Sequence, residues 1–429
     1  MTANFDQIID DVTCTQCGCL CDDLSPRLKD GRLVEVQRAC SLAAPWYDAL
    51  ASHDPSLPAA MIDGAPAEYA AAITRAAGIL ANADAPLIYG LSNSSTPGQQ
   101  AAVALADRLG AIIDTTASTC HAPSIVALQQ VGESTASLGE VRQRSDLVIY
   151  WGSNPVDSHP RHIERLIDQP GTFVPRGRLG RTVIVIDVEP TATTRLADEF
   201  IQVNPGGDFE LLCALRACAQ GREWQGSDAG GVSRAEVESL ALRMQGAQFG
   251  AVFFGLGLTR HGIPHLNINA LLQLVTDLQV HTRWIARRMR IPGDVAGADS
   301  VLCWQTGYPF SVDLARGYPR YNPGEFSGGE LLTRGEVDAA LFVGSDGYHK
   351  LSPAARSHLG SIPTILLTPP HITDPWQATV QFATGTYGVH YAGTAYRMDE
   401  VPLPLRPFLP STLPADHHVL QALMLAVGR

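Results

Sequence analysis

The sequence lacks the features that mark membrane and secreted proteins. No run of about 18 uninterrupted apolar residues occurs, so no membrane-spanning helix is expected. Residues 1–7 are polar and acidic, and they lack the basic and apolar regions of a signal peptide. Without an export signal, the nine cysteines are expected to be reduced thiols of a cytoplasmic protein.

Positive charge is also scarce. The 429 residues include 31 Lys and Arg against 43 Asp and Glu, a formal net charge of −12, and only Lys29 and Lys350 are lysines. Binding to nucleic acid requires a concentrated positive face, so nucleic acid is not an expected partner. The arginines can still hold an anionic cofactor, because guanidinium groups bind phosphate and carboxylate groups through two parallel hydrogen bonds.

Several common catalytic signatures are missing. The chain contains no GxGxxG or Walker A sequence, which argues against ordinary dinucleotide-binding and P-loop proteins. It also contains no GxSxG or HExxH sequence, which argues against two common classes of hydrolase.

Four cysteines near the amino terminus have the spacing of iron–sulfur ligands. Cys14, Cys17, Cys21 and Cys40 form the pattern C-x2-C-x3-C-x18-C, and Cys19 is then spare. A [4Fe–4S] cluster needs four thiolates, which a tight loop and a returning segment can supply. A zinc site is an alternative, since C-x2-C is also half of a zinc knuckle. A disulfide or unmetallated thiols are also compatible with the spacing.

Apolar strand-like runs alternate with Ala- and Leu-rich helical stretches over most of the chain. Such runs, ending in Gly or Asp, are typical of parallel sheets covered on both faces, so we expect an α/β, doubly wound architecture. One helix is expected over 101–109, and a further helix around Cys213 and Cys218 is expected to bury both as packing residues. The expected strands are 85–90, 111–114, 146–152, 182–188, 250–255, 338–344 and 362–368.

The domain organisation follows from where these patterns change. Residues 1–60 are expected to form a small cysteine-rich β cap, with a hairpin over 28–36 turning at Asp30 and Gly31. Residues 61–115 and 330–400 are expected to form one discontinuous α/β domain, and 116–329 a second. Residues 401–429 are expected to form a carboxyl-terminal extension.

Polar residues at strand ends are candidates for nucleotide binding. Ser153 and Asn154 follow one strand, Asp187 ends another, and Asp208 follows a third strand-like segment. Free amides in such turns bind phosphate, and a strand-end carboxylate commonly binds ribose hydroxyls. An ordinary turn between a strand and a helix is the alternative.

Cys120 and His121 form an isolated pair after the strand at 111–114. A thiolate is a soft metal ligand, and an adjacent imidazole can move protons near neutral pH. A buried cysteine beside a loop histidine is the alternative.

Five segments together resemble a known family, the B subunit of formylmethanofuran dehydrogenase. This family belongs to the molybdopterin oxidoreductase superfamily and is related to the catalytic subunits of formate dehydrogenases. The resemblance implies a molybdopterin oxidoreductase-like fold without the carboxyl-terminal barrel domain of longer relatives. The segments are residues 14–24, 119–124, 151–162, 304–310 and 393–399.

The resemblance also implies cofactors and roles. It places a [4Fe–4S] cluster on Cys14, Cys17, Cys21 and Cys40, and a tungsto- or molybdo-bis(pterin guanine dinucleotide) whose metal is bound by Cys120. His121 would shuttle a proton, and Arg290 would hold formate or CO2 near the metal. The guanine dinucleotides would lie at the turns of Ser153, Asn154, Asp187 and Asp208.

The implied activity is the interconversion of CO2 and formate within a complex. One expected partner is an amidohydrolase-like A subunit, which joins formate to methanofuran or hydrolyses the formyl amide. The others are the C subunit and a small barrel protein, the D subunit. The alternative is a cofactor-poor structural subunit of the bacterial formyltransferase/hydrolase complex, which releases formate without redox chemistry. The chain departs from formate dehydrogenases in having no lysine just after Cys40.

Overall fold

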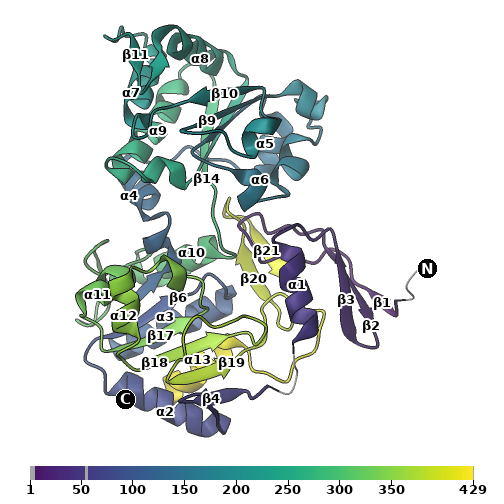
Figure 1. Cartoon of the computed structure of the whole chain (residues 1–429), viewed down its shortest axis with the longest axis vertical. Helices are drawn as coiled ribbons and strands as arrows, with labels where there is room; N and C mark the ends of the chain where they lie inside the picture. Colours follow the sequence, from purple (N-terminus) through teal and green to yellow (C-terminus); the bar gives the residue numbers. More distant parts are fainter. Residues whose placement is uncertain (1–4, 54–56, 429) are drawn as a thin grey trace. The chain divides into compact units, whose positions relative to one another are not determined.

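The apolar runs of the sequence form two parallel sheets in the computed structural model, which describes residues 5–53 and 57–428 (Figure 1). Each sheet belongs to its own compact unit. Unit 1 comprises residues 1–120 and 291–429, and unit 2 comprises residues 121–290. The chain therefore passes between the units twice, at Cys120–His121 and at Arg290–Ile291.

Unit 1 contains a nine-stranded sheet in the order β16-β15-β7-β6-β17-β18-β19-β4-β5. The five central strands, β7 to β19 in this order, are parallel, and the strands at both edges are antiparallel. The strands are β4 (Ala60–Ile62), β5 (Ala65–Pro66), β6 (Pro86–Gly90), β7 (Ile112–Thr115), β15 (Val312–Asp313), β16 (Arg320–Tyr321), β17 (Ala339–Val343), β18 (Thr364–Thr368) and β19 (Val380–Ala383).

Successive side chains of the central strands of unit 1 enter opposite apolar layers, as the period of a strand requires. Ile88 and Leu341 face one layer, whereas Leu87 and Phe342 face the other. The first layer includes α2 (Tyr69–Ala81), α3 (Thr96–Leu109), α10 (Val295–Thr306) and α13 (Asp416–Ala426). The second includes the neighbouring helices α11 (Gly328–Arg334) and α12 (Pro353–Leu359), seen side by side in Figure 1.

The remaining elements of unit 1 surround the cysteine-rich segment. A three-stranded antiparallel sheet consists of β1 (Gln7–Ile8), β2 (Ser25–Lys29) and β3 (Arg32–Gln37), and α1 (Ala43–Ser52) follows it. A hairpin near the carboxyl end pairs β20 (Gly393–Tyr396) with β21 (Pro402–Leu405). Asp30 and Gly31 both have positive φ angles, which the tight turn between β2 and β3 requires.

Unit 2 contains a five-stranded parallel sheet in the order β10-β9-β8-β13-β14. Its strands are β8 (Leu147–Trp151), β9 (Thr182–Asp187), β10 (Glu199–Gln202), β13 (Phe249–Phe254) and β14 (Arg283–Arg288). Its α-helices are α4 (Ala122–Val131), α5 (Leu138–Arg144), α6 (Pro155–Ser158), α7 (Asp208–Ala219), α8 (Arg234–Gly246) and α9 (Pro264–Leu278), and a small hairpin pairs β11 (Asp228–Ala229) with β12 (Val232–Ser233).

The structure places some segments differently from the sequence analysis. Residues 291–329, which the sequence grouped with the second α/β domain, lie in unit 1. The prediction that Cys213 is a packing residue was wrong, because its side chain is exposed on α7, whereas Cys218 is partly buried against the core of unit 2. None of the helices in the described residues is long and apolar enough to cross a bilayer.

Candidate functional site

The amino-terminal cysteines lie on a loop that closes on itself. The amide of Val12 donates to the carbonyl of Leu24 (3.0 Å), and the amide of Cys14 donates to the carbonyl of Cys21 (2.8 Å). The amide of Ala44 in α1 donates to the carbonyl of Cys40 (2.8 Å), which ties the fourth cysteine to the start of that helix. Cys14, Cys17 and Cys21 are buried and Cys40 is half-buried.

Distant parts of unit 1 hold this loop in place. Thr13 donates through its hydroxyl to the carbonyl of Pro404 (3.1 Å), and the carbonyl of Gly18 accepts from the amide of Met398 (2.8 Å). Leu20, which has a positive φ of 37°, packs with Leu405 in a small apolar cluster. The loop conformation thus depends on residues almost 400 positions further along the chain.

The four cysteines are close enough to affect one another electrostatically. Burial raises the pKa of the Cys14 thiol well above its usual range, and the nearby Cys17, Cys21 and Cys40 raise it further. The thiol and the amide of Cys19 donate to Cys17 and lower the pKa of the Cys17 thiol. A bound metal cation reverses the effect of burial and makes such thiols ionise.

The four-cysteine group (Cys14, Cys17, Cys21 and Cys40) fits an iron–sulfur cluster. A [4Fe–4S] cluster is held by four cysteine thiolates, each on a different iron atom. All nine cysteines lie within the described residues, and none of them forms a disulfide. Across residues 5–53 and 57–428, no three His, Cys, Asp or Glu side chains surround a single point as a lone metal ion would require.

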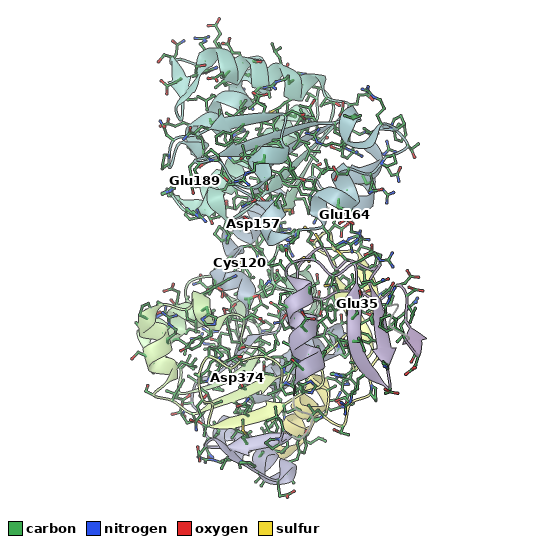
Figure 2. The ribbon with its side chains drawn as sticks, turned by 45° about the vertical axis from the view of Figure 1, so that its right-hand side comes forward. Glu35, Cys120, Asp157, Glu164, Glu189 and Asp374 are labelled. Atoms are coloured by element: carbon green, nitrogen blue, oxygen red, sulfur yellow. The ribbon has the colours of Figure 1, made fainter. Side chains whose placement is uncertain are left out.

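Cys120, labelled in Figure 2, is the last residue before the chain first leaves unit 1. It is 8% exposed, and its Sγ lies 4.0 Å from the carbonyl oxygen of Ile291, the first residue after the chain returns. The two points at which the chain leaves and re-enters unit 1 are therefore adjacent, with the thiol of Cys120 between them.

Buried polar side chains fix the turn that carries Cys120. The Asp114 carboxylate accepts from the amides of Thr115 (3.0 Å), Ser311 (2.9 Å) and Gly328 (2.7 Å). Burial raises the pKa of this carboxyl to about 6. The hydroxyl groups of Tyr89 and Thr119 lie 3.3 Å apart, which anchors the residue just before Cys120 to strand β6.

The segment that re-enters unit 1 connects Cys120 to the cysteine loop. Gly293 donates through its amide to the carbonyl of Gln16 (3.5 Å), which lies between Cys14 and Cys17. A Cβ atom on Gly293 would come within 2.8 Å of the carbonyl oxygens of Thr15 and Ser92, so glycine is required for this close approach. Because two residues span at most about 7 Å, the Cys120 thiol lies within about 15 Å of the Gln16 carbonyl.

His121 and Arg290 are the residues of unit 2 at the two crossings. Both side chains are buried, at 7% and 4% exposure. The carbonyl of Arg290 accepts from Nε2 of His159 (2.9 Å), whose Nδ1 lies 2.8 Å from the hydroxyl of Ser158. Burial lowers the pKa of His159 to about 4, so the neutral ring donates to the backbone of Arg290. The chemical roles expected of Cys120, His121 and Arg290 stay predictions.

The four predicted nucleotide-binding residues all lie at the carboxyl edge of the unit 2 sheet. Ser153 and Asn154 follow β8, at the point where strand order reverses between β8 and β13, and ligands of open α/β sheets bind at such reversals. The Asn154 side chain accepts from the hydroxyl of Thr193 (2.7 Å) and donates to Asp157 (2.6 Å).

Two carboxyl groups lie close together at the same edge. Asp208 accepts from the indole N–H of Trp151 (2.8 Å), and Asp187 accepts from the amide of Val188 (2.8 Å). Burial raises the pKa of both carboxyls, and the charge of Asp208 raises that of Asp187 further. The positive charge of Arg260 opposes the shift of Asp187. Such carboxylates can accept hydrogen bonds from the N–H groups of a purine base or from ribose hydroxyls.

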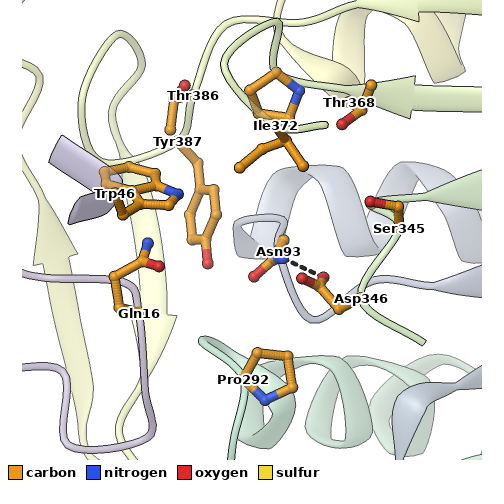
Figure 3. A pocket seen from close by; sticks show the side chains of 12 residues that line it. Gln16, Trp46, Asn93, Pro292, Ser345, Asp346, Thr368, Ile372, Thr386 and Tyr387 are labelled. Carbon is orange, nitrogen blue, oxygen red and sulfur yellow. Dashed lines mark hydrogen bonds between the residues drawn. The ribbon is translucent and has the colours of Figure 1, made fainter. Parts of the chain in front are cut away.

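Sequence reasoning missed a second crevice, at the corresponding position of unit 1. Strand order there reverses between β6 and β17, and a cavity of about 90 Å³ opens beyond the ends of these strands. Figure 3 shows Trp46 and Tyr387 on one side of the cavity and the hydrogen-bonded pair Asn93 and Asp346 on the other. Its lining residues are Gln16, Trp46, Asn93, Pro292, Gly344, Ser345, Asp346, Thr368, Pro369, Ile372, Thr386 and Tyr387.

A signal for this cavity was present in the sequence. Ser92 and Asn93 follow one strand, and Gly344, Ser345 and Asp346 follow another, as Ser153 and Asn154 do in unit 2. Gln16 belongs to the cysteine loop, so the cavity lies directly beside the four-cysteine group. Burial raises the pKa of the Asp346 carboxyl.

No protein-family model matches the chain. The B subunit of tungsten-containing formylmethanofuran dehydrogenase 2 from Methanocaldococcus jannaschii is 38% identical over 426 residues, covering 97% of this chain and 98% of that protein. The chain belongs to the family of formylmethanofuran dehydrogenase B subunits. The resemblance carried by the five sequence segments is thereby confirmed.

Two solved structures have the same fold as this chain, and a further curated protein is similar to it in sequence. The B subunit of the formyltransferase/hydrolase complex of Methylorubrum extorquens is 28% identical over 289 residues, covering 67% of this chain and 75% of that protein. A chain of that complex, solved with methylofuran, superposes with a TM-score of 0.71 at 24% identity, covering 86% of this chain and 98% of that one. Acetylene hydratase from Pelobacter acetylenicus superposes with a TM-score of 0.67 at 11% identity, covering 98% of this chain and 69% of that one.

Proposed function

We propose that this chain is the redox subunit of a formylmethanofuran dehydrogenase-type complex. It interconverts CO2 and formate, and a partner subunit forms or hydrolyses formylmethanofuran. The observation that carries this proposal is the arrangement of unit 1, where residues 291–293 connect the four-cysteine group to Cys120. A chain that served only as a scaffold would have no need for five buried or half-buried thiols grouped in this way.

The cofactors follow from the donor sets. The four-cysteine group would hold a [4Fe–4S] cluster, and Cys120 would bind the tungsten or molybdenum of a bis(pterin guanine dinucleotide). When bound, that metal centre takes up the two electrons released as formate loses a proton and becomes CO2.

The protein side chains would bind and orient formate, and they would accept its proton. In this proposal the guanidinium of Arg290 attracts the carboxylate of formate, and His121 accepts the proton that formate loses. His159 holds the Arg290 backbone through its carbonyl, which limits the positions from which the guanidinium can act. The low exposure of Cys120 keeps bulk water away from the thiol.

Two nucleotide portions require two crevices, and each sheet supplies one. The turns of Ser153 and Asn154, with Asp187 and Asp208, would bind one guanine dinucleotide in unit 2. The cavity beside Asp346 would take part of the other in unit 1. The turns of unit 2 were the expected site of both dinucleotides, and the cavity in unit 1 favours one dinucleotide for each unit instead.

The proposed partners complete the reaction. The amidohydrolase-like A subunit would handle the formyl amide, and the C subunit and the small barrel D subunit would complete the assembly. The formyltransferase/hydrolase relatives support a complex of several subunits.

Metal analysis of the intact complex, purified without oxygen, tests the proposal. About four iron atoms and about one tungsten or molybdenum atom are expected per B subunit. Iron and tungsten or molybdenum both near zero would leave the second candidate, a structural subunit of a complex that releases formate without redox chemistry. Zinc in place of iron would show that the four-cysteine group is a zinc site.

The variant Cys120→Ser separates the two chemistries. It should abolish CO2–formate exchange, because the hydroxyl is a poor ligand for a soft metal site. Hydrolysis of the formyl amide on the partner subunit should be unchanged. Retention of CO2–formate exchange would show that Cys120 is not the metal ligand.

A further inference from the structure

An ordered loop of unit 2 presents large apolar side chains to solvent. Residues 168–181 join the π-helix η2 (Ile163–Ile167) to strand β9, at the amino edge of the five-stranded sheet. Phe173 is 58% exposed and Leu179 is 82% exposed, whereas side chains of these types are usually buried. The candidate nucleotide turns lie at the opposite, carboxyl edge of the sheet, so the proposed function makes no use of this loop.

The buried side chain of Arg181 holds the loop in one conformation. Its guanidinium donates to the carbonyls of Ser145 (3.1 Å), Ile167 (2.6 Å) and Gln169 (2.8 Å). These carbonyls belong to the residue after α5, to η2 and to the loop itself. Because a guanidinium offers five N–H donors in a rigid fork, one side chain fixes the loop against two neighbouring segments.

Further contacts order the backbone on both sides of the exposed residues. The amide of Phe173 donates to the carbonyl of Gln143 (2.9 Å), and the guanidinium of Arg144 lies over the Phe173 ring, 4.6 Å from its centroid. Arg178 donates to the carbonyl of Leu196 (2.8 Å), which is itself an exposed apolar residue. The loop is therefore ordered before any partner binds, which lowers the entropy that binding costs.

The surface around this loop carries positive charge. The loop surface consists of residues 140–144, 168–181 and 195–198, which the contacts above join. It contains six arginines and three acidic residues, although the chain as a whole has a formal net charge of −12. The arginines are Arg142, Arg144, Arg176, Arg178, Arg181 and Arg195, and the acids are Glu140, Asp168 and Asp198. An acidic protein thus has a basic region with exposed apolar side chains here.

This charge selects the kind of partner. Two of the acids are neutralised by arginines of the same surface, Glu140 by Arg144 (3.4 Å) and Asp198 by Arg178 (3.0 Å). A second copy of the chain in a two-fold dimer would place the loop surface against itself, positive against positive. Nucleic acid or an anionic membrane would be repelled by the acidic remainder of the chain. An acidic face of a different protein complements the loop surface without either conflict.

We propose that the loop surface docks an acidic face of a partner subunit, with Phe173 and Leu179 as the buried anchors and the arginines around them. Aromatic and arginine side chains dominate the binding energy of protein interfaces, and acidic and lysine side chains are depleted there. The inference rests on the proposed function only in requiring that the chain assembles with partner subunits. It requires neither the cluster nor the pterin.

Photocrosslinking in the assembled complex tests the docking. p-Benzoylphenylalanine replaces Leu179 in one preparation, and in the control it replaces Leu242, a 68% exposed leucine on α8 of the same unit. After irradiation, position 179 should link to an Asp- or Glu-rich segment of one partner subunit, and position 242 should not link to that segment. Links from position 179 to a segment without acidic residues, to a second copy of this chain, to lipid or nucleic acid, or to nothing would each overturn the inference.

Two variants measure the contribution of the loop surface to affinity. Leu179→Asp places a carboxylate against the acidic face of the partner, and Arg176→Glu reverses one charge. Each should raise the Kd for the linked subunit by about thirtyfold or more, measured on dilution of the complex. Leu242→Asp should match the wild type, and the wild-type affinity should fall as salt is raised. Equal Kd values for Leu179→Asp and the wild type would overturn the inference.

Failure of this inference and failure of the proposed function give different results. The same preparations are assayed for iron and for tungsten or molybdenum. Complexes that hold none of these metals and still give the expected crosslink would overturn the redox function and leave the inference standing. A wild-type chain that purifies without any partner subunit would overturn both.

Discussion

At the scale of single residues, His162 is a buried histidine without hydrogen-bond partners. Its side chain is 1% exposed, and neither ring nitrogen has a partner among the described residues. It packs edge to face against Phe253 (4.7 Å between centroids) and Tyr150 (5.8 Å). Burial lowers its pKa to about 3, and the nearby His159 adds to the effect. The imidazole is therefore neutral in the folded protein and costs stability that an apolar ring would not.

We predict that His162→Phe stabilises unit 2 and reduces its sensitivity to acid. Removing two buried polar atoms without partners should add about 1–3 kcal/mol near neutral pH. In the wild type the unfolded chain binds a proton below about pH 6.5 while the folded ring does not. This histidine therefore lowers stability by about 1.4 kcal/mol for each pH unit from 6.5 down to about 3.

Thermal unfolding between pH 4 and pH 8 measures both effects. The control is His349→Phe, the same change at an exposed position of unit 1. An acid dependence in His162→Phe equal to that of the wild type would contradict the prediction.

At the scale of elements, the sequence predicted the regular parts and not the long-range contacts. All seven expected strands exist, because buried parallel strands are continuous apolar runs that few other structures produce. The hairpin turn at Asp30 and Gly31 was also found, since its residues determine its geometry. Contacts such as that of Gly293 with Gln16 join residues that are far apart in sequence, and no local pattern encodes them.

The candidate site could be predicted only in part for the same reason. The spacing of Cys14, Cys17 and Cys21 is local, so a single sequence shows it. The cavity beside Asp346 depends on how α1 and the strand ends come together, which the spacing alone does not determine.

Asp294 caps the amino terminus of α10 and joins it to β20. Its Oδ1 accepts from the amides of Gly297 (2.9 Å) and Tyr396 (2.7 Å), and its Oδ2 accepts from Nε2 of Gln99 (3.1 Å). Burial raises the pKa of this carboxyl to about 8 in spite of the three donors. The Asp294 carboxyl is therefore mostly protonated at neutral pH.

We predict that Asp294→Asn removes a pH dependence from the stability of unit 1. Between about pH 4 and pH 8 the folded carboxyl holds a proton that the unfolded chain has lost. The wild type should thus lose about 1.4 kcal/mol for each pH unit as pH rises through this range, and level off above pH 8. Asparagine keeps the Oδ1 acceptor, and rotation of the Gln99 amide can offer its unpartnered Oε1 to the new amide group.

The measurement is the difference in unfolding free energy between wild type and Asp294→Asn across this range. Asp48→Asn, on the exposed side of α1, controls for loss of a carboxylate. A difference that does not change with pH would show that Asp294 titrates normally.

At the scale of the whole molecule, unit 2 is one uninterrupted segment inserted into unit 1. Every strand pairing of its five-stranded sheet lies within residues 121–290, and so does the apolar cluster on one face of that sheet. Unit 1, in contrast, is built from two segments that are separated in sequence by unit 2, and both contribute strands to its nine-stranded sheet.

We predict that residues 121–290 fold when expressed alone. A core confined to one continuous segment does not depend on the rest of the chain. Far-ultraviolet circular dichroism should show α/β content, and heating should give one cooperative transition. A broad, non-cooperative transition would mean that unit 2 requires contacts with the remainder of the protein.

The anchoring of the cysteine loop sets the order of events during synthesis. Three of its residues are held by partners that leave the ribosome late, namely Gly293, Met398 and Pro404. The first cysteines to be made are therefore among the last to acquire their final geometry. Under the proposed function, iron delivered to a nascent chain would meet loose thiols, so cluster insertion would follow release of the finished polypeptide.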